Sequence, residues 1–269
     1  MKILAVITAA ESAHACLDAA LTAAAADRSA SIEALHIIVD PERLVSSSEE
    51  VQLQRLREHD EGSVRQRAAA AQAAFVSWNA GLDVHAPRVD WKEVVGAEEE
   101  SLADAAREAD LIVLAKHIDL DSADARHAAL LKCGKPVLVV PGDWRPHSGR
   151  FDHVVVGLSD TPIAAHAIDK SLPWIQAAGE VTALRIGSED DAAVAQLDRL
   201  RETGPKIELR VFPPVGDDLG AQIVMVAASI GADLLVVGAY RHGPLVEWLL
   251  GGTTRHMLAA SAVPLFLVH

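Results

Sequence analysis

Short apolar runs alternate with longer helix-forming segments along the chain. The first half predicts strands at Lys2–Thr8, Ser31–Asp40, Leu82–Trp91, Asp110–Ala115 and Lys135–Val140. Between them, helix formers predict helices at Ser12–Asp27, Ser46–Asn79, Ala97–Ala109 and Ser122–Cys133. Most of the strand segments are largely apolar, as in a parallel sheet buried on both faces, and Leu82–Trp91 alternates like a more exposed strand.

One segment interrupts this order. Pro141–Asp152 is dense in proline, glycine and polar residues and follows a completed strand, so a linker is predicted within this segment. After it, strands are predicted at His153–Ser159, Glu180–Gly187, Lys206–Pro213, Leu234–Val237 and Val263–Val268. Helices are predicted at Pro162–Ala177, Glu189–Glu202 and Asp217–Ile230, and a last helix starts at Pro244.

The two halves repeat one element order, most clearly where ADLIVLAK and KPVLVVP in the first half parallel ADLLVVGA and VPLFLVH in the second. This predicts an α/β fold of two tandem five-stranded, mostly parallel, doubly wound (Rossmann-like) domains. The domains are residues 1–141 and 153–269, joined by a linker at 142–152. We further expect Val263–Val268 to pair with Val137–Val140, which covers both sheet edges, and Trp144 and Trp248 to pack the halves together.

Ligands of such sheets bind beyond the carboxyl ends of the strands, in the turns after the first and fourth strands of each half. The halves differ there: from Asp110 to Pro136 is 26 positions, and from Asp233 to Pro264 is 31. The shorter loop also lacks the glycine that the second half has at Gly238. Because backbone N–H groups must come close to a phosphate to bind it, we expect the first site to be vestigial.

Charge and cysteine content narrow the class of protein. A formal net charge of −14 over 269 residues argues against a nucleic acid or an anionic membrane as partner. The two cysteines, Cys16 and Cys133, form no CxxC pair, so neither a disulfide framework nor a zinc site is predicted. The N-terminus has no secretory signal and no apolar run reaches 18 residues, so we expect a cytoplasmic protein.

With these features the chain resembles the tandem universal stress proteins, whose domain binds an adenine nucleotide. In that family a loop of pattern G-x2-G-x9-G-S/T follows the fourth strand. Gly238 matches its first glycine and Gly251 its third, whereas Arg241 stands at the second glycine and Gly252 at the hydroxyl position. Thr253 and Thr254 follow directly. Thr8 and Ser159 stand where the family has an adenine-recognising aspartate, and Asp160 lies one position later.

The resemblance implies that ATP or another adenine nucleotide binds in the second half. The implied contact residues come from the first-strand turn and the loop: Ser159, Asp160, Val237, Gly238, Arg241, His242, Gly251, Gly252, Thr253 and Thr254. Alternatives stay open for several of them. Asp160–Thr161–Pro162 can instead cap a helix, and Thr253 and Thr254 can be capping or phosphorylated residues. His36, in a motif like the family's second strand, is expected to be structural.

No catalytic motif is found. Gly251–Arg255 reads GGTTR and lacks the lysine of a P-loop, and neither G-x-S-x-G nor H-E-x-x-H occurs. We therefore expect a non-enzymatic stress-response binding or regulatory protein that needs no metal and no obligatory cofactor. The alternatives are an enzyme of the same superfamily that hydrolyses nucleotides or transfers adenylyl groups, and an interaction module that binds no nucleotide. The sequence leaves a homodimer open.

Overall fold

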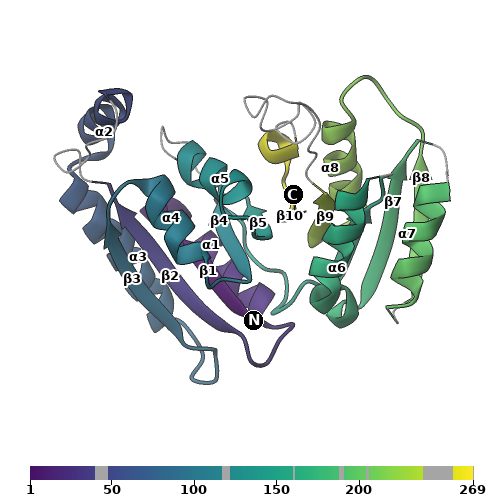
Figure 1. Ribbon diagram of the computed structural model, residues 1–269. Helices are drawn as coiled ribbons and strands as arrows, with labels where there is room; N and C mark the ends of the chain where they lie inside the picture. The colour runs from purple at the N-terminus through teal and green to yellow at the C-terminus, as the bar shows by residue number, and fades with distance from the viewer. Residues whose placement is uncertain are drawn as a thin grey trace.

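The computed structural model describes residues 1–39, 48–116, 122–159, 161–187, 191–203, 206–238 and 257–268. Within these ranges ten strands form one sheet of order β3-β2-β1-β4-β5-β10-β9-β6-β7-β8 (Figure 1). The strands of the first half are β1 (Lys2–Val6), β2 (Ser31–Ile38), β3 (Val89–Val95), β4 (Leu111–Ala115) and β5 (Val137–Val140). Those of the second are β6 (His153–Gly157), β7 (Glu180–Ile186), β8 (Ile207–Phe212), β9 (Leu234–Gly238) and β10 (Leu265–Val268).

All strand pairs within each half are parallel, and the two five-stranded sets have the same order. The predicted fold class, two tandem doubly wound α/β domains, is confirmed. The sets join at β5 and β10, which pair antiparallel with Leu265 opposite Val139. This is the strand pairing expected from the sequence, and it leaves β3 and β8 as the outer strands of a continuous sheet.

Helices cover both faces of the sheet. The helices are α1 (Ala10–Ala24), α2 (Ser48–Glu61), α3 (Val64–Ala80), α4 (Glu98–Ala106), α5 (Ser122–Leu131), α6 (Pro162–Ala177), α7 (Asp191–Arg201) and α8 (Leu219–Ser229). Alternate residues of β1 enter different cores: Ile3 and Ala5 belong to the core that includes residues of α1, α3, α6 and α7, and Leu4 and Val6 to the core that includes residues of α4, α5 and α8. Each core contains residues of both halves, so the domains share their hydrophobic layers.

Two tryptophans strengthen the junction. Trp174 on α6 is 4% exposed, its ring centroid lies 5.0 Å from that of Phe266, and its Nε1 donates to the carbonyl of Ala23 on α1 at 2.9 Å. Trp144 packs on the same core, 6.3 Å from the buried Phe151. Trp144 therefore has the packing role expected of it, whereas Trp248 and the helix predicted from Pro244 lie outside the described residues.

The helix predicted over Ser46–Asn79 is wrong as a single element. In the described part of this segment α2 ends at Glu61 and α3 begins at Val64, and Gly62 between them has a φ of +90°. Ser63 then starts α3 with a capping box: its side chain accepts from the N–H of Gln66, and the Gln66 side chain accepts from the N–H of Ser63. Gly62 is thus a helix break, a role that its conformational freedom allows.

The strand predicted over Leu82–Trp91 is also displaced, because β3 spans Val89–Val95. The preceding residues turn around Asp83, whose side chain accepts from the N–H of His85 at 2.8 Å and whose carbonyl accepts from the N–H of Ala86 at 2.9 Å. An aspartate that bonds to the backbone two residues later favours a turn over a strand. The first part of the alternating segment therefore forms a turn.

Candidate functional site

The strand order reverses direction between β1 and β4 in the first half and between β6 and β9 in the second. In doubly wound sheets the crevice outside the carboxyl ends of the strands at this switch point is the usual ligand site. Each half therefore has one candidate crevice. Thr8 and Lys116 follow β1 and β4 at the first crevice, and Ser159 follows β6 and Gly238 ends β9 at the second.

In the second half, the crevice is built on a close approach between β9 and the first turn of α6. A Cβ atom at Gly238 would lie 2.9 Å from the backbone nitrogen of Ala164 and 3.0 Å from the carbonyl carbon of Ile163. Thr161 caps α6 by accepting from the N–H of Ala164 at 3.3 Å, and Pro162 occupies the first turn. The helix-capping interpretation of Thr161 and Pro162 is confirmed, and it puts the positive end of the α6 dipole at the crevice.

The end of β6 is held by two side chains. The guanidinium of Arg185 on β7 donates to the carbonyl of Leu158 at 3.2 Å. Gln196 on α7, which is 7% exposed, accepts from the N–H of Ser159 at 3.2 Å and donates to the carbonyl of the same residue. The Ser159 hydroxyl lies 3.0 Å from that of Thr161. These contacts fix the backbone of the strand end that faces the crevice.

In the first half, His36 on β2 takes the place of Arg185. Its Nδ1 lies 2.8 Å from the carbonyl oxygen of Ile7. Because a carbonyl can only accept, Nδ1 carries the hydrogen. Burial lowers the pKa of His36, and the charges of Arg57 and Arg67 lower it further. His36 is 6% exposed and stacks on Trp91, with ring centroids 6.1 Å apart, which agrees with the structural role predicted for it.

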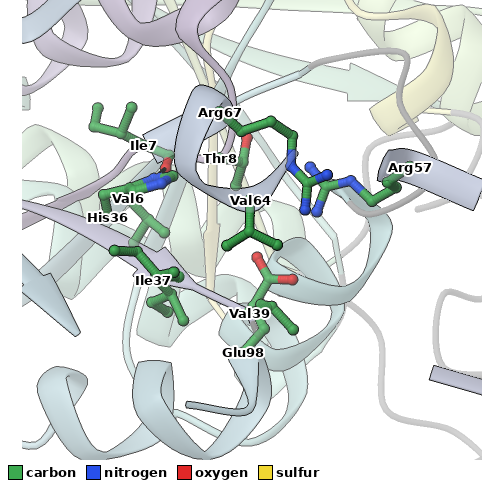
Figure 2. A pocket seen from close by; sticks show the side chains of 11 residues that line it. Val6, Ile7, Thr8, His36, Ile37, Val39, Arg57, Val64, Arg67 and Glu98 are labelled. Carbon is green, nitrogen blue, oxygen red and sulfur yellow. Dashed lines mark hydrogen bonds between the residues drawn. The ribbon is translucent and has the colours of Figure 1, made fainter. Parts of the chain in front are cut away.

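Beyond the ends of β1 and β2 lies a small cavity of about 30 Å³, drawn in Figure 2. Arg57 and Arg67 enter it from α2 and α3, and Glu98 enters from the start of α4. Both guanidinium groups also approach one carboxylate oxygen of Glu61, Arg57 Nε at 3.0 Å and Arg67 Nε at 4.0 Å. The crevice of the first half thus contains charged side chains of both signs, in a space that suits a few water molecules.

The residue after β4 in the first half makes a contact across the junction. The Lys116 ammonium donates to the carbonyl of Ser261 in the second half at 2.5 Å, and partial burial lowers its pKa. The Lys116 backbone is just as closely packed, because a Cβ at Gly142 would collide with its carbonyl oxygen. The corresponding position of the second half is Ala239, which has no comparable side chain and lies outside the described residues.

Residues 158–269, which include the whole crevice of the second half, match the Universal stress protein family. The likeness to this family therefore lies in the second half of the chain. No curated protein matches the chain.

Solved structures extend the likeness in fold to the whole chain. A universal stress protein from Archaeoglobus fulgidus is 14% identical, with a TM-score of 0.62 over 99% of this chain and 95% of that one. A functionally unknown protein from Pseudomonas aeruginosa is 15% identical, with a TM-score of 0.58 over 99% and 92% of the two chains. Both show that the tandem fold is shared over nearly the full length.

Of the site residues expected in the universal stress protein domain, Ser159, Val237 and Gly238 are described. They lie together at the ends of β6 and β9, where the Val237 side chain packs over Gly157 and is 5% exposed. The side chain of Val237 is thus not available to a ligand. The other expected contact residues lie outside the described residues: Asp160, Arg241, His242, Gly251, Gly252, Thr253 and Thr254.

Sequence reasoning missed Gln196 as a residue of this crevice. The sequence does point to Arg185, because it aligns with His36 in the repeat. Nothing in the sequence marks Gln196, which lies in a helix rich in polar residues. Within the described ranges no three His, Cys, Asp or Glu side chains lie close enough together to hold a metal ion. In the same ranges no helix is long and apolar enough to cross a membrane.

Proposed function

We propose that this protein is a non-enzymatic binding or regulatory protein of the stress response that takes an adenine nucleotide, such as ATP, in its second half. The observation that carries the proposal is the close contact of Gly238 with the start of α6, because it brings a helix amino end, the Ser159 backbone and the start of the loop to one crevice. Backbone N–H groups and a helix dipole favour a phosphate at such a place.

Binding rather than catalysis is supported by the side chains at the crevice. Among the described residues there, Ser159 and Thr161 offer hydroxyls, Gln196 an amide and Arg185 a guanidinium. None of these groups is a general base near neutral pH. The nucleotide would act by population shift, in proportion to its different affinity for two arrangements of the loop and the domain junction. A cytoplasmic location belongs to the same proposal.

The first half is proposed to serve as the partner of this domain and not as a second nucleotide site. Lys116 bonds to Ser261 across the junction where the family's loop begins, and Arg57, Arg67 and Glu98 take up space beyond β1 and β2. Any homodimer would have to use surfaces other than β5 and β10, because these edges pair with each other.

The test is to purify the full chain, denature it, and analyse the released nucleotides by chromatography, then titrate ATP, ADP and AMP calorimetrically. We expect one site, occupied or titratable. Gly251→Val, at the third motif glycine, should abolish the heat of binding. Gly149→Val is the matched control, because Gly149 lies in the linker and a Cβ there would have no atom within 4 Å.

Two results would count against the proposal. If no nucleotide is released and none gives heat, the second half is an interaction module. If ATP is instead consumed at a rate that Arg241→Ala removes, the protein is an enzyme of the same superfamily.

A further inference from the structure

The contact between Gln196 and Ser159 resembles the recognition of an adenine base. The Gln196 amide oxygen accepts from the Ser159 N–H at 3.2 Å, and its amide nitrogen donates to the Ser159 carbonyl. Adenine carries the same pair of groups, an acceptor ring nitrogen beside the donor amino group at N6. A side-chain carboxamide therefore presents to Ser159 the hydrogen-bonding pattern that an adenine edge would present.

The Ser159 edge is not used by the described part of the sheet. At this strand end, the N–H of Leu158 still bonds to the neighbouring strand, at the carbonyl of Leu184, and its own carbonyl is taken by Arg185. Ser159 follows directly at the carboxyl end of β6, and its N–H and carbonyl form a two-point edge that the Gln196 side chain on α7 occupies. Backbone groups that are shielded from water need a partner, and the Gln196 side chain is the partner of both Ser159 groups.

Gln196 can leave this edge without unfolding the domain. It lies on α7, which packs mainly against the outer strand β8, while Leu197 and Leu200 anchor the helix in the core. An exposed ion pair between Arg199 and Asp169 on α6 holds the same helix at the surface. A rotation of one side chain is therefore enough to free Ser159, with α7 staying in place.

We propose that the Ser159 backbone is the base-recognising edge of the second half and that Gln196 is an internal substitute for adenine, which the nucleotide displaces when it binds. This inference rests on the proposed function, to which it adds the base contact and the residue that competes for it. A ligand must then displace Gln196, so its apparent affinity is the intrinsic affinity multiplied by the fraction of molecules in which the Ser159 edge is free. Gln196 sets the affinity for adenine without touching the bound ligand.

The first half has a different arrangement at the matching position. Thr8 lies at the end of β1 as Ser159 lies at the end of β6, but there it lines the cavity with Arg57 and Arg67. Among the described residues that line this cavity there is no glutamine. The carboxamide contact is thus a feature of the second half and not a general need of this strand end.

The experiment measures ATP affinity calorimetrically for the full chain and for Gln196→Ala, Gln196→Met and Arg199→Ala. Alanine removes the competing amide, and methionine keeps its length without its hydrogen bonds. Arg199→Ala is the matched control, because it loosens α7 at the surface and leaves the Gln196 contact in place. A second ligand, purine riboside triphosphate, lacks the N6 amino group and so cannot donate to the Ser159 carbonyl.

We expect ATP to bind Gln196→Ala and Gln196→Met about tenfold more tightly than the unmodified chain, since two hydrogen bonds no longer compete. Arg199→Ala should bind as the unmodified chain does. Purine riboside triphosphate should bind both Gln196 variants more weakly than ATP does, because it cannot donate to the Ser159 carbonyl. In the unmodified chain, saturating ATP should move the Gln196 side-chain amide signals in NMR spectra, which are assigned by their loss in Gln196→Ala.

The outcomes separate this inference from the proposed function. ATP that binds all four proteins equally, or that leaves the Gln196 amide signals unmoved, would overturn the base contact and leave nucleotide binding intact. Equal affinities of ATP and purine riboside triphosphate for Gln196→Ala would overturn it too. If no nucleotide binds any variant, including those with the Ser159 edge exposed, both the proposed function and the base contact are refuted.

Discussion

Gly238 ends β9 so close to α6 that a side chain there should shift the backbone. A Cβ would lie 2.9 Å from the nitrogen of Ala164 and 3.0 Å from the carbonyl carbon of Ile163. Both atoms belong to the capped first turn of a helix, so they cannot rotate away as a side-chain end would. We expect Gly238→Ala to lower the free energy of unfolding by about 1–3 kcal/mol, as overpacking does.

Two other glycines give the scale for this measurement. Gly231 has a φ of +75°, so an alanine there should cost about 1 kcal/mol of backbone strain. Gly149 has neither a positive φ nor an atom within 4 Å of a Cβ, so Gly149→Ala should stay within about 0.5 kcal/mol of the unmodified chain. Urea unfolding followed by circular dichroism measures all three.

If Gly238→Ala is as stable as Gly149→Ala, β9 does not approach the first turn of α6 as closely as described, and the crevice does not have the described geometry. The same close approach limits what a substitution at Gly238 can show in a binding study. A variant at this position alters packing as well as the loop, so loss of binding in it would not by itself locate the nucleotide.

Three further predictions concern the junction, the thiols and one histidine. Trp174→Phe should lower the free energy of unfolding by about 1 kcal/mol, because the hydrogen bond to the Ala23 carbonyl is lost. Trp174→Ala should lower it by about 3–5 kcal/mol in urea unfolding, and a loss below about 1 kcal/mol would contradict the shared core. Burial raises the pKa of the Cys16 thiol to about 12 and that of the Cys133 thiol to about 11. At about pH 8, Ellman's reagent should therefore react slowly with Cys133 and with Cys16 only after unfolding, and prompt labelling of Cys16 would contradict this. Burial lowers the pKa of His36, so as the pH falls the unfolded chain takes up a proton at this histidine before the folded chain does, and the free energy of unfolding should fall below about pH 6.5. His36→Gln should reduce the slope of the free energy of unfolding against pH in this range, and an unchanged slope would contradict the role given to His36.

The fold could be predicted because its signal is repeated and local. A short apolar run such as Val137–Val140 predicts a buried strand, which is what the structure has. The helix α6 is predicted at its observed bounds because Pro162 marks its first turn. The failures occur where a single residue decides between two local structures. Gly62 can sit within a helix at a cost or break it, and only the capping box of Ser63 with Gln66 decides.

The site was harder to predict because its contacts depend on tertiary distance. Gln196 reaches Ser159 across 37 positions, and nothing in the residues around either one marks the pair. The loop motif of the family marks Gly238 as a residue whose backbone contacts phosphate. Its neighbours in space add a second reason for glycine, the approach of a helix turn. Motif spacing identifies such a position, but it does not show which of the two demands is met there.

The duplicated halves keep one backbone arrangement and differ in the side chains that serve it. The N–H of Ile7 bonds to the carbonyl of Leu35 as that of Leu158 bonds to Leu184, and the freed carbonyl is then taken by His36 in one half and by Arg185 in the other. A strand end that faces a crevice needs such a donor whatever the crevice holds. His36 and Arg185 are therefore evidence of common architecture and not of a common ligand. The residues that can differ in function are those one position further on, at Thr8 and Ser159, where one backbone faces a cavity with two arginines and the other is closed by an amide.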